Sequence, residues 1–422
     1  MPGNEAMATR VTRNARRRQL AAIAAGALIL GVDGFDIISV SVAAPGIAIE
    51  WGLDRAQLGW LLATEVMGAA MGAAVLGHLA DIHGRRTIIL ACLLVMAAGM
   101  ALTAVASDPL TLAAIRLVTG IGLGGLNPAV TSMVSEVASE PQRDKSVAAL
   151  GLGYAIGAII GGASASWLLS SESWRVIFVA GSLFTGVSLL VATRFIPETL
   201  APRALTRHAT TPIGLHEGAA GDAGARTVPR EGGMLLRGRN GRNAALLTLA
   251  SMGQLSTFYF SLKWLPKLAV DAGMSVSAGA SVLTIFNVGG LAGMLAMAPL
   301  ARLVGLKAFT MSAFISSGGA ILVLALSLGQ PLATMATACL TGMLANAAFG
   351  GLYASVARAF PSELRSTGIG LTLGLGRGGA AFAPIITGIL FNLGATVPSV
   401  ALAMTFTSVA AAFLVAFATI EH

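Results

Sequence analysis

The sequence predicts an all-α integral membrane protein with twelve transmembrane helices arranged as two pseudo-symmetric halves of six. Three observations lead to this fold class. The 422 residues are 55% hydrophobic and only 11% charged, whereas a soluble domain carries about 25% charged residues. Twelve apolar segments reach the length of roughly 20 residues that crosses a bilayer as a helix. A single long polar segment separates the first six from the last six.

The first six predicted helices are joined by short loops and form an N-terminal half, residues 20–195. A basic arm, residues 1–19, precedes them. We place these helices at residues 20–49, 56–79, 86–106, 110–137, 145–170 and 174–195.

The segment 196–243 is rich in Pro, Gly, Ala, Thr and Arg and has no apolar periodicity. This composition is typical of a flexible connector. The C-terminal half, residues 244–419, follows it, and residues 420–422 form a short tail. We place the helices of this half at residues 244–270, 277–300, 306–328, 332–359, 366–393 and 396–419.

The 27 lysines and arginines are unevenly distributed. Most of them fall in the arm, in the linker and in the loops on the linker's side of the membrane. The positive-inside rule therefore predicts that both termini are cytoplasmic, in a bacterial-type inner membrane. The formal charge of +8 then reports orientation in a lipid bilayer and not a nucleic-acid partner. Two cysteines and five histidines without ligand spacing predict no metal site, and the absence of a nucleophile constellation predicts that the protein is not an enzyme.

The loop after the second helix reads Gly77-His-Leu-Ala-Asp81-Ile82-His-Gly84-Arg85-Arg86. It resembles the G-x-L-a-D-R-x-G-R-R signature of the major facilitator superfamily, with Ile82 at a position where the signature has a basic residue. Gly77 would allow close helix approach, and Asp81 could accept hydrogen bonds at a helix N-terminus. The residues expected to control conformational change in this loop and after helices four and ten are Gly77, Asp81, Gly84, Arg85, Arg86, Glu136, Arg143 and Arg365.

Further motifs narrow the resemblance. The runs Asp33-Gly34-Phe35-Asp36 and Trp264-Leu265-Pro266 resemble the aromatic acid:proton symporter family. This resemblance implies a monomeric symporter without a cofactor that uses the proton gradient. Its partners would be a proton and a small aromatic carboxylate such as a hydroxybenzoate, imported by alternating access. The alternatives are a carrier for a non-aromatic organic acid, nicotinate or a sugar-like substrate, and, from another class, a non-transporting membrane sensor.

Ionisable residues inside the apolar segments point to the same function, because charges in a membrane are functional by default. At about 1.5 Å per residue, Asp33 and Arg116 lie at the same depth in a core of about 30 Å, and Glu65 is near the midplane. The i,i+3 pair Asp33 and Asp36 shares one helix face. The resemblance extends to proton-coupled sugar porters, which implies that Asp36 works with Arg116. The alternative is a permanent ion pair. Glu65 is either a second proton site or a buried neutral acid.

The substrate carboxylate has one strong candidate ligand, Arg377, whose guanidinium can donate two parallel hydrogen bonds. Its alternative role is a structural pair with Glu65 or with a helix carbonyl. Lys263, near the outer end of the seventh helix, either attracts anions or extends to the headgroups.

Aromatic side chains could surround a planar ring, although core or lipid packing is the alternative for each. The candidates are Phe35, Tyr154, Phe258, Tyr259, Trp264 and Phe286. Trp60 and Trp174 are expected to be interface anchors. The G-x-x-x-G spacing of Gly153, Gly157 and Gly161 predicts close helix packing.

Overall fold

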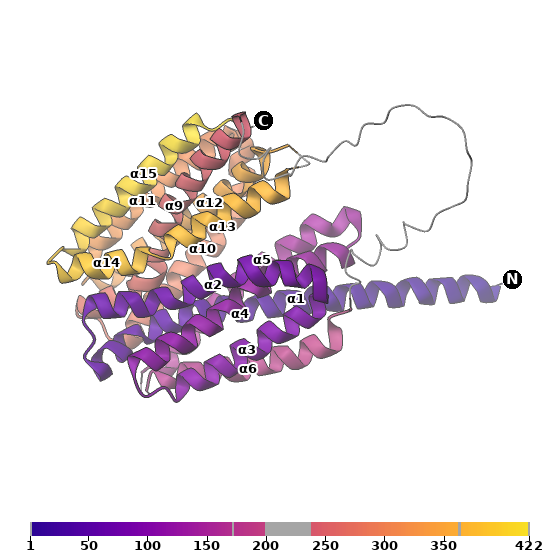
Figure 1. Ribbon diagram of the computed structural model, residues 1–422, viewed down its shortest axis with the longest axis horizontal. Helices are drawn as coiled ribbons and strands as arrows, with labels where there is room; N and C mark the ends of the chain where they lie inside the picture. Colours follow the sequence, from indigo (N-terminus) through magenta and orange to yellow (C-terminus); the bar gives the residue numbers. More distant parts are fainter. Residues whose placement is uncertain (1, 171–172, 199–237, 362–363, 421–422) are drawn as a thin grey trace, which may run out of the picture.

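The helices form two groups, one from each side of the polar linker (Figure 1). The computed structural model describes residues 2–170, 173–198, 238–361 and 364–420, without the side chains of residues 2–15, 78, 81 and 365–367. Most of the predicted linker, residues 199–237, lies outside the described residues.

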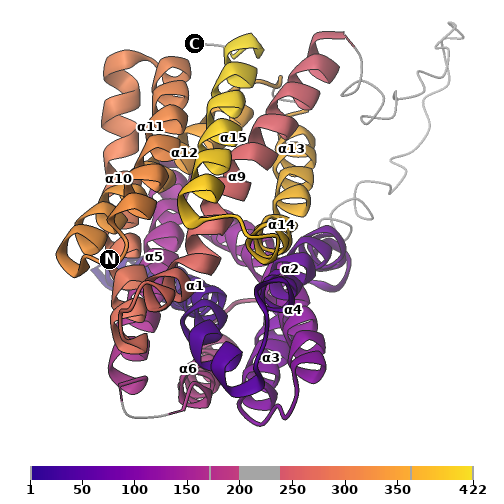
Figure 2. The ribbon, with the colours of Figure 1, turned by 90° about the vertical axis from the view of Figure 1, so that its left-hand side faces the viewer.

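The N-terminal group has six long helices and one short 3-10 turn. They are α1 (Pro2–Trp51), α2 (Arg55–His83), α3 (Arg85–Ala104), α4 (Pro109–Val137), η1 (Glu140–Gln142), α5 (Arg143–Leu168) and α6 (Arg175–Phe195). The C-terminal group has seven described helices. They are α9 (Gly238–Asp271), α10 (Val276–Val304), α11 (Leu306–Ser327), α12 (Pro331–Arg358), α13 (Arg365–Ala380), α14 (Ala383–Asn392) and α15 (Val397–Phe417). Figure 2 shows the two groups one above the other.

The predicted all-α class is confirmed. Eleven stretches among the described residues are long and apolar enough to cross a membrane, judged by length and composition. The twelfth predicted helix is α9, which at 34 residues is long enough but carries lysines at 263 and 267.

Three boundaries differ from the prediction. The basic arm is not separate from the first helix, because α1 runs back to Pro2. Helix α9 begins at Gly238, inside the segment predicted as linker. The membrane span predicted over 366–393 is present as Gly368–Asn392, but its helix breaks between α13 and α14. Pro384 explains the break: it lacks a backbone N–H, and its ring clashes with the carbonyl of the residue four positions earlier.

Polar residues cap several helices at the same end of the bundle. Asp54 accepts a hydrogen bond from the backbone N–H of Gln57 at 2.8 Å to start α2, and Asp108 accepts one from Thr111 at 2.9 Å to start α4. Ser275 caps α10 in the same way at 3.1 Å. Each cap satisfies a backbone donor that the first helical turn leaves free.

The two halves repeat one local arrangement at the opposite end. Gly84 ends α2 with φ 91°, and Gly305 ends α10 with φ 86°; glycine adopts this conformation without steric cost. Arg86 then donates to the carbonyl of Thr193 at 2.8 Å. Lys307 donates to the carbonyl of Ala418 at 3.0 Å. In each half, the start of the third helix is thus tied to the end of the last one.

The halves pack on each other where α5 meets α10, α1 meets α9 and α2 meets α14. Arg55 pairs with Asp271 at 3.2 Å, and a Cβ on Gly59 would meet the carbonyl oxygen of Pro384 at 2.5 Å. We call this end the closed end. The opposite end, where α1 begins and α15 ends, is called the terminal end (Figure 1).

Trp174 also lies at the closed end, where its predicted role as an interface anchor is wrong. Its side chain is buried, and its indole N–H donates to Glu50 Oε2 at 2.7 Å. The guanidinium of Arg175 covers the ring at 4.3 Å from its centroid. Trp60, in contrast, is 52% exposed, in agreement with an anchor.

Candidate functional site

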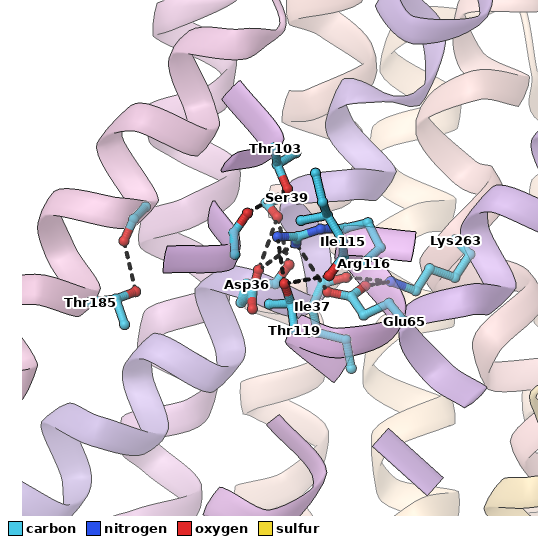
Figure 3. A network of polar contacts seen from close by, with 12 residues as sticks. Asp36, Ile37, Ser39, Glu65, Thr103, Ile115, Arg116, Thr119, Thr185 and Lys263 are labelled. Atoms are coloured by element: carbon cyan, nitrogen blue, oxygen red, sulfur yellow. Dashed lines mark hydrogen bonds and ion pairs between the residues drawn. The ribbon is translucent and has the colours of Figure 1, made fainter. Parts of the chain in front are cut away.

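Asp36 of α1 and Arg116 of α4 form a fully buried ion pair (Figure 3). Arg116 Nη1 lies 2.9 Å from Asp36 Oδ1, and Nη2 donates to Thr119 Oγ1 at 3.2 Å. The guanidinium also rests on the ring of Phe178, 5.3 Å from its centroid. The structure therefore brings together the two residues that the resemblance pairs, while their role in coupling stays a prediction.

Depth counting placed Arg116 level with Asp33 and left the lateral contact open, and the ion pair forms with Asp36. At 3.6 residues per turn, the two aspartates are about 60° apart around α1, so depth does not decide which one contacts Arg116.

Glu65 of α2 and Lys263 of α9 extend this pair into a group of four charges (Figure 3). Lys263 Nζ donates to Glu65 Oε2 at 2.6 Å and to the carbonyl of Ile37 at 2.6 Å. Glu65 Oε1 lies 3.6 Å from Arg116 Nη1. We call Asp36, Glu65, Arg116 and Lys263 the buried tetrad.

The tetrad corrects two expectations. Lys263 is 0% exposed, so its expected extension to the headgroups is wrong: the side chain turns into the bundle and satisfies its donors there. The alternative pair of Arg377 with Glu65 is not formed, because Glu65 pairs with Lys263 and Arg116.

Glycines bring α2 and α4 close enough for the tetrad to form. A Cβ on Gly120 would overlap the carbonyl oxygen of Glu65 itself, and one on Gly68 would overlap that of Leu117. Close backbone approach of this kind requires residues without a side chain. The predicted close approach at Gly77 is wrong, since a Cβ there would only touch Pro128 at 3.9 Å.

A second polar group lies beside the tetrad, between the two halves. The Asn127 side chain lies close to the carboxyl of Asp33, and the guanidinium of Arg377 lies within electrostatic range of it. Tyr154 and Tyr259 share the field of the same guanidinium. We call these five residues the Arg377 group. Its members come from α1, α4 and α5 of one half and from α9 and α13 of the other.

Gly34, between the two aspartates, sets the position of Asp33. A Cβ there would overlap the carbonyl oxygen of Tyr154 on α5. The predicted packing of the glycine series on α5 is confirmed as well, because a Cβ on Gly157 would overlap the carbonyl oxygen of Gly31.

The aromatic candidates separate into two sets. Phe258 is stacked with Phe349 at 6.2 Å and 24°, and lies 5.9 Å from the ring of Tyr259 and 6.3 Å from that of Phe286. This set adjoins the Arg377 group through Tyr259.

Phe35 and Trp264 belong to the core instead. Phe35 is buried edge-on against Phe184 at 5.8 Å. Trp264 is fully buried against Phe391 at 5.3 Å. Their expected place around a ring substrate is therefore wrong, and both fill space between helices.

Sequence reasoning missed Asn127 and Phe349. Asn127 is a polar residue in the apolar run before Pro128, which is a signal that could have found it. Phe349 has no such signal, because a phenylalanine in an apolar helix is ordinary.

The expected gating residues lie at the terminal end. Arg85 forms an ion pair with Glu136, and Arg143 Nε donates to the carbonyl of Ser135 at 3.1 Å. These contacts join α3 to α4 and α4 to α5. The side chains of Asp81 and Arg365 lie outside the described residues.

Arg377 is half-buried, and no ion pair between described side chains includes it. Within the described part of the chain, no group of three His, Cys, Asp or Glu side chains could hold a metal ion.

Comparison with known proteins agrees with this geometry. Residues 26–281 match the model of the Major Facilitator Superfamily. The chain is 29% identical to the gallate transporter of Pseudomonas putida, over 88% of this chain and 85% of that protein. It is 31% identical to the gentisate transporter of Corynebacterium glutamicum, over 89% of this chain and 83% of that protein.

Among solved structures, the D-xylose–proton symporter superposes with a TM-score of 0.75 at 15% identity, covering 96% of this chain and 97% of that one. At this identity the likeness concerns the fold alone. Together, the matched residues, the relatives and the helical arrangement show that the chain belongs to the Major Facilitator Superfamily, whose proteins are transporters and not enzymes.

Proposed function

We propose that this protein imports a small aromatic carboxylate, such as a hydroxybenzoate, together with a proton, by alternating access of a site between its two halves. The observation that carries the proposal is the position of Arg377. Its guanidinium lies within electrostatic range of Asp33 on the other half, and Asp33 is one helical turn from Asp36 of the buried pair.

The carboxylate of the substrate binds Arg377 in this proposal. A guanidinium presents two parallel donors that match a carboxylate, and the ion pairs of the described residues leave this one available. Tyr154 and Tyr259 place two hydroxyl groups in the same region. A phenol can donate to and accept from a ring hydroxyl, which favours a hydroxylated ring.

The ring itself would lie against the aromatic set of Phe258 and Phe349. Aromatic pairs prefer offset-stacked or edge-to-face contacts, and these two side chains are already half-exposed and stacked on each other. Gallate and gentisate, in the names of the two relatives, are both hydroxylated benzoates. The substrate class follows from the carboxylate ligand, the hydroxyl partners and the ring contacts together.

Asp36 would carry the coupled proton, and Asp33 would pass it to the terminal end. Asp36 is fully buried while Asp33 is 3% exposed, and Asp33 lies one turn closer to the start of α1. Asp33 therefore lies between the proton site and the terminal end.

The terminal end faces the cytoplasm in this proposal. A hollow of about 1180 Å³ at that end is lined by Arg16, Arg17, Arg18, Arg86 and Arg194. This concentration of arginine supports the orientation that the positive-inside rule gives. The described state would then be closed to the outside, and a monomer contains both halves of the site.

Uptake into proteoliposomes tests the substrate assignment. With an inward proton gradient, we expect accumulation of radiolabelled gentisate that excess benzoate competes for and excess xylose or succinate does not. Arg377→Gln should abolish binding of gentisate in a thermal-shift assay. Arg302→Gln is the control, since Arg302 is an exposed arginine on the same half. Normal gentisate binding by Arg377→Gln, or equal competition by succinate, would exclude the proposed site.

A further inference from the structure

Lys263 is the one tetrad member that comes from the C-terminal half. Asp36, Glu65 and Arg116 lie on α1, α2 and α4, whereas Lys263 lies on α9. Its ammonium crosses the boundary to bond Glu65 and the carbonyl of Ile37, each at 2.6 Å. Any movement that separates the halves at the closed end must withdraw this charge from the tetrad.

The charges of the tetrad balance only while Lys263 is present. With both acids ionised and both bases protonated, the four side chains are neutral as a group. Withdrawal of the ammonium leaves two carboxylates and one guanidinium, with a net charge of −1. All four side chains are 0% exposed, and an uncompensated buried charge is so costly that a group changes its protonation state instead.

The tetrad also offers a place for that proton. Among the described residues, Asp36 Oδ2 and Glu65 Oε1 are buried carboxylate oxygens without a hydrogen-bond partner. The other oxygen of each carboxylate is held by a cation, Arg116 for Asp36 and Lys263 for Glu65. Glu65 Oε1 is also 3.6 Å from Arg116 Nη1, an ion-pair distance without a hydrogen bond. A proton on Asp36 Oδ2 or Glu65 Oε1 restores neutrality once Lys263 has left.

We infer that the Lys263 ammonium and the transported proton occupy the tetrad alternately. When the closed end opens, Lys263 withdraws and one proton from the outside binds Asp36 or Glu65. When it closes, the ammonium returns, and the displaced proton leaves through Asp33 toward the terminal end. Lys263 thus acts as a tethered substitute for the proton, which makes closure without proton release unfavourable.

Other ionisable groups surround Glu65 and belong to the same balance. Asp33 on α1, Tyr154 on α5 and Tyr259 on α9 lie within its electrostatic range. Asp33 and Tyr154 belong to the same half as Glu65 and stay beside it when the halves separate. Tyr259 moves with Lys263 on α9, but it carries an uncharged phenol, so the change in charge at Glu65 comes from Lys263.

The inference rests on the alternating access proposed above but not on the aromatic substrate, so it can be tested without substrate. Leu110 on α4 and Leu332 on α12 are 81% and 83% exposed and begin helices at the closed end of different halves. Spin labels at Leu110→Cys and Leu332→Cys, with Cys92 and Cys339 replaced by alanine, report separation of the halves at that end. Their distance distribution is measured from mildly alkaline to mildly acidic pH.

One proton taken up on opening makes the ratio of open to closed molecules rise about tenfold for each unit that the pH falls. We expect this slope in the unsubstituted tetrad and in Lys263→Arg, which keeps the charge. Lys263→Met should lose the slope. Without the ammonium, the tetrad has a net charge of −1 in both the open and the closed state, so it binds a proton in both. Glu65→Gln should also lose the slope, because Asp36 and Arg116 alone are neutral once Lys263 has withdrawn. This variant provides the test if Lys263→Met does not fold.

The matched control is Arg55→Gln. Arg55 also joins the halves, through Asp271, but this pair is partly exposed and shares no proton site. A simple adhesive role for Lys263 predicts that both substitutions shift the open fraction without changing its slope with pH. A retained slope in Lys263→Met, a lost slope in Arg55→Gln, or no pH dependence in the unsubstituted tetrad would overturn the inference. Gentisate uptake by the same preparation decides the proposed function separately.

Discussion

Gly120 is the position where one methyl group should most directly disturb the tetrad. A Cβ at this residue would overlap the carbonyl oxygen of Glu65, which is a helical backbone atom and cannot turn aside. Gly120→Ala therefore forces α2 and α4 apart, and Arg116 lies one turn earlier on α4. The pair of Arg116 and Glu65, already at 3.6 Å, would lengthen.

The free energy of unfolding should fall by about 1–3 kcal/mol, the usual cost of overpacking a filled interior. Gly186→Ala is the control, because a Cβ there meets no atom within 4 Å. Replacing a helical glycine at an open position gains roughly 0.5–1 kcal/mol, so the two variants should differ by about 1.5–4 kcal/mol. The measurement is the unfolding midpoint of the purified proteins in detergent, together with gentisate uptake. Equal midpoints and full uptake by Gly120→Ala would refute the glycine packing as the basis of the tetrad.

Two further predictions concern the ends of the bundle. Hydrogen bonds from Thr111 lower the pKa of Asp108 below its usual 3.8, so this cap stabilises the fold above that pH and its contribution disappears as the pH falls through the lowered pKa. Asp108→Ala should lower the midpoint of thermal unfolding at neutral pH. Asp108→Asn, which caps the helix without titrating, should match the native protein at that pH. An unchanged midpoint in Asp108→Ala would contradict the stabilising role of the cap. The side chains of Arg85 and Glu136 are partly exposed. A double-mutant cycle should therefore give a coupling energy of about 0.2–1 kcal/mol that salt weakens. A coupling energy well above that range would mean that the pair is effectively buried.

Much of the architecture was predictable because it depends on local features. Apolar length located the helices, and the capping residues Asp54 and Asp108 mark two of their starts closely. The break before α14 was not recognised, although Pro384 is a local signal for it. The extension of α9 back to Gly238 was missed because basic residues there resembled a linker.

The site was less predictable, because it depends on how helices rotate and approach each other. Depth counting placed Arg116 level with Asp33 but did not select its partner, since rotation about α1 decides which aspartate it contacts. It also placed Lys263 near a membrane surface, whereas the side chain points to Glu65 across the boundary of the halves. Contacts between distant segments, such as Gly120 with Glu65, set these rotations, and no local pattern encodes them.

The measurement that tests the central claim most directly is proton movement driven by the substrate. Proteoliposomes that contain a pH-sensitive dye receive gentisate outside in the absence of any proton gradient. We expect the lumen to acidify as gentisate enters, more than in protein-free vesicles, and we expect Asp36→Asn to abolish this acidification. Gentisate entry through the protein without acidification, or undiminished acidification in Asp36→Asn, would contradict the proposal that the protein carries a proton with an aromatic carboxylate.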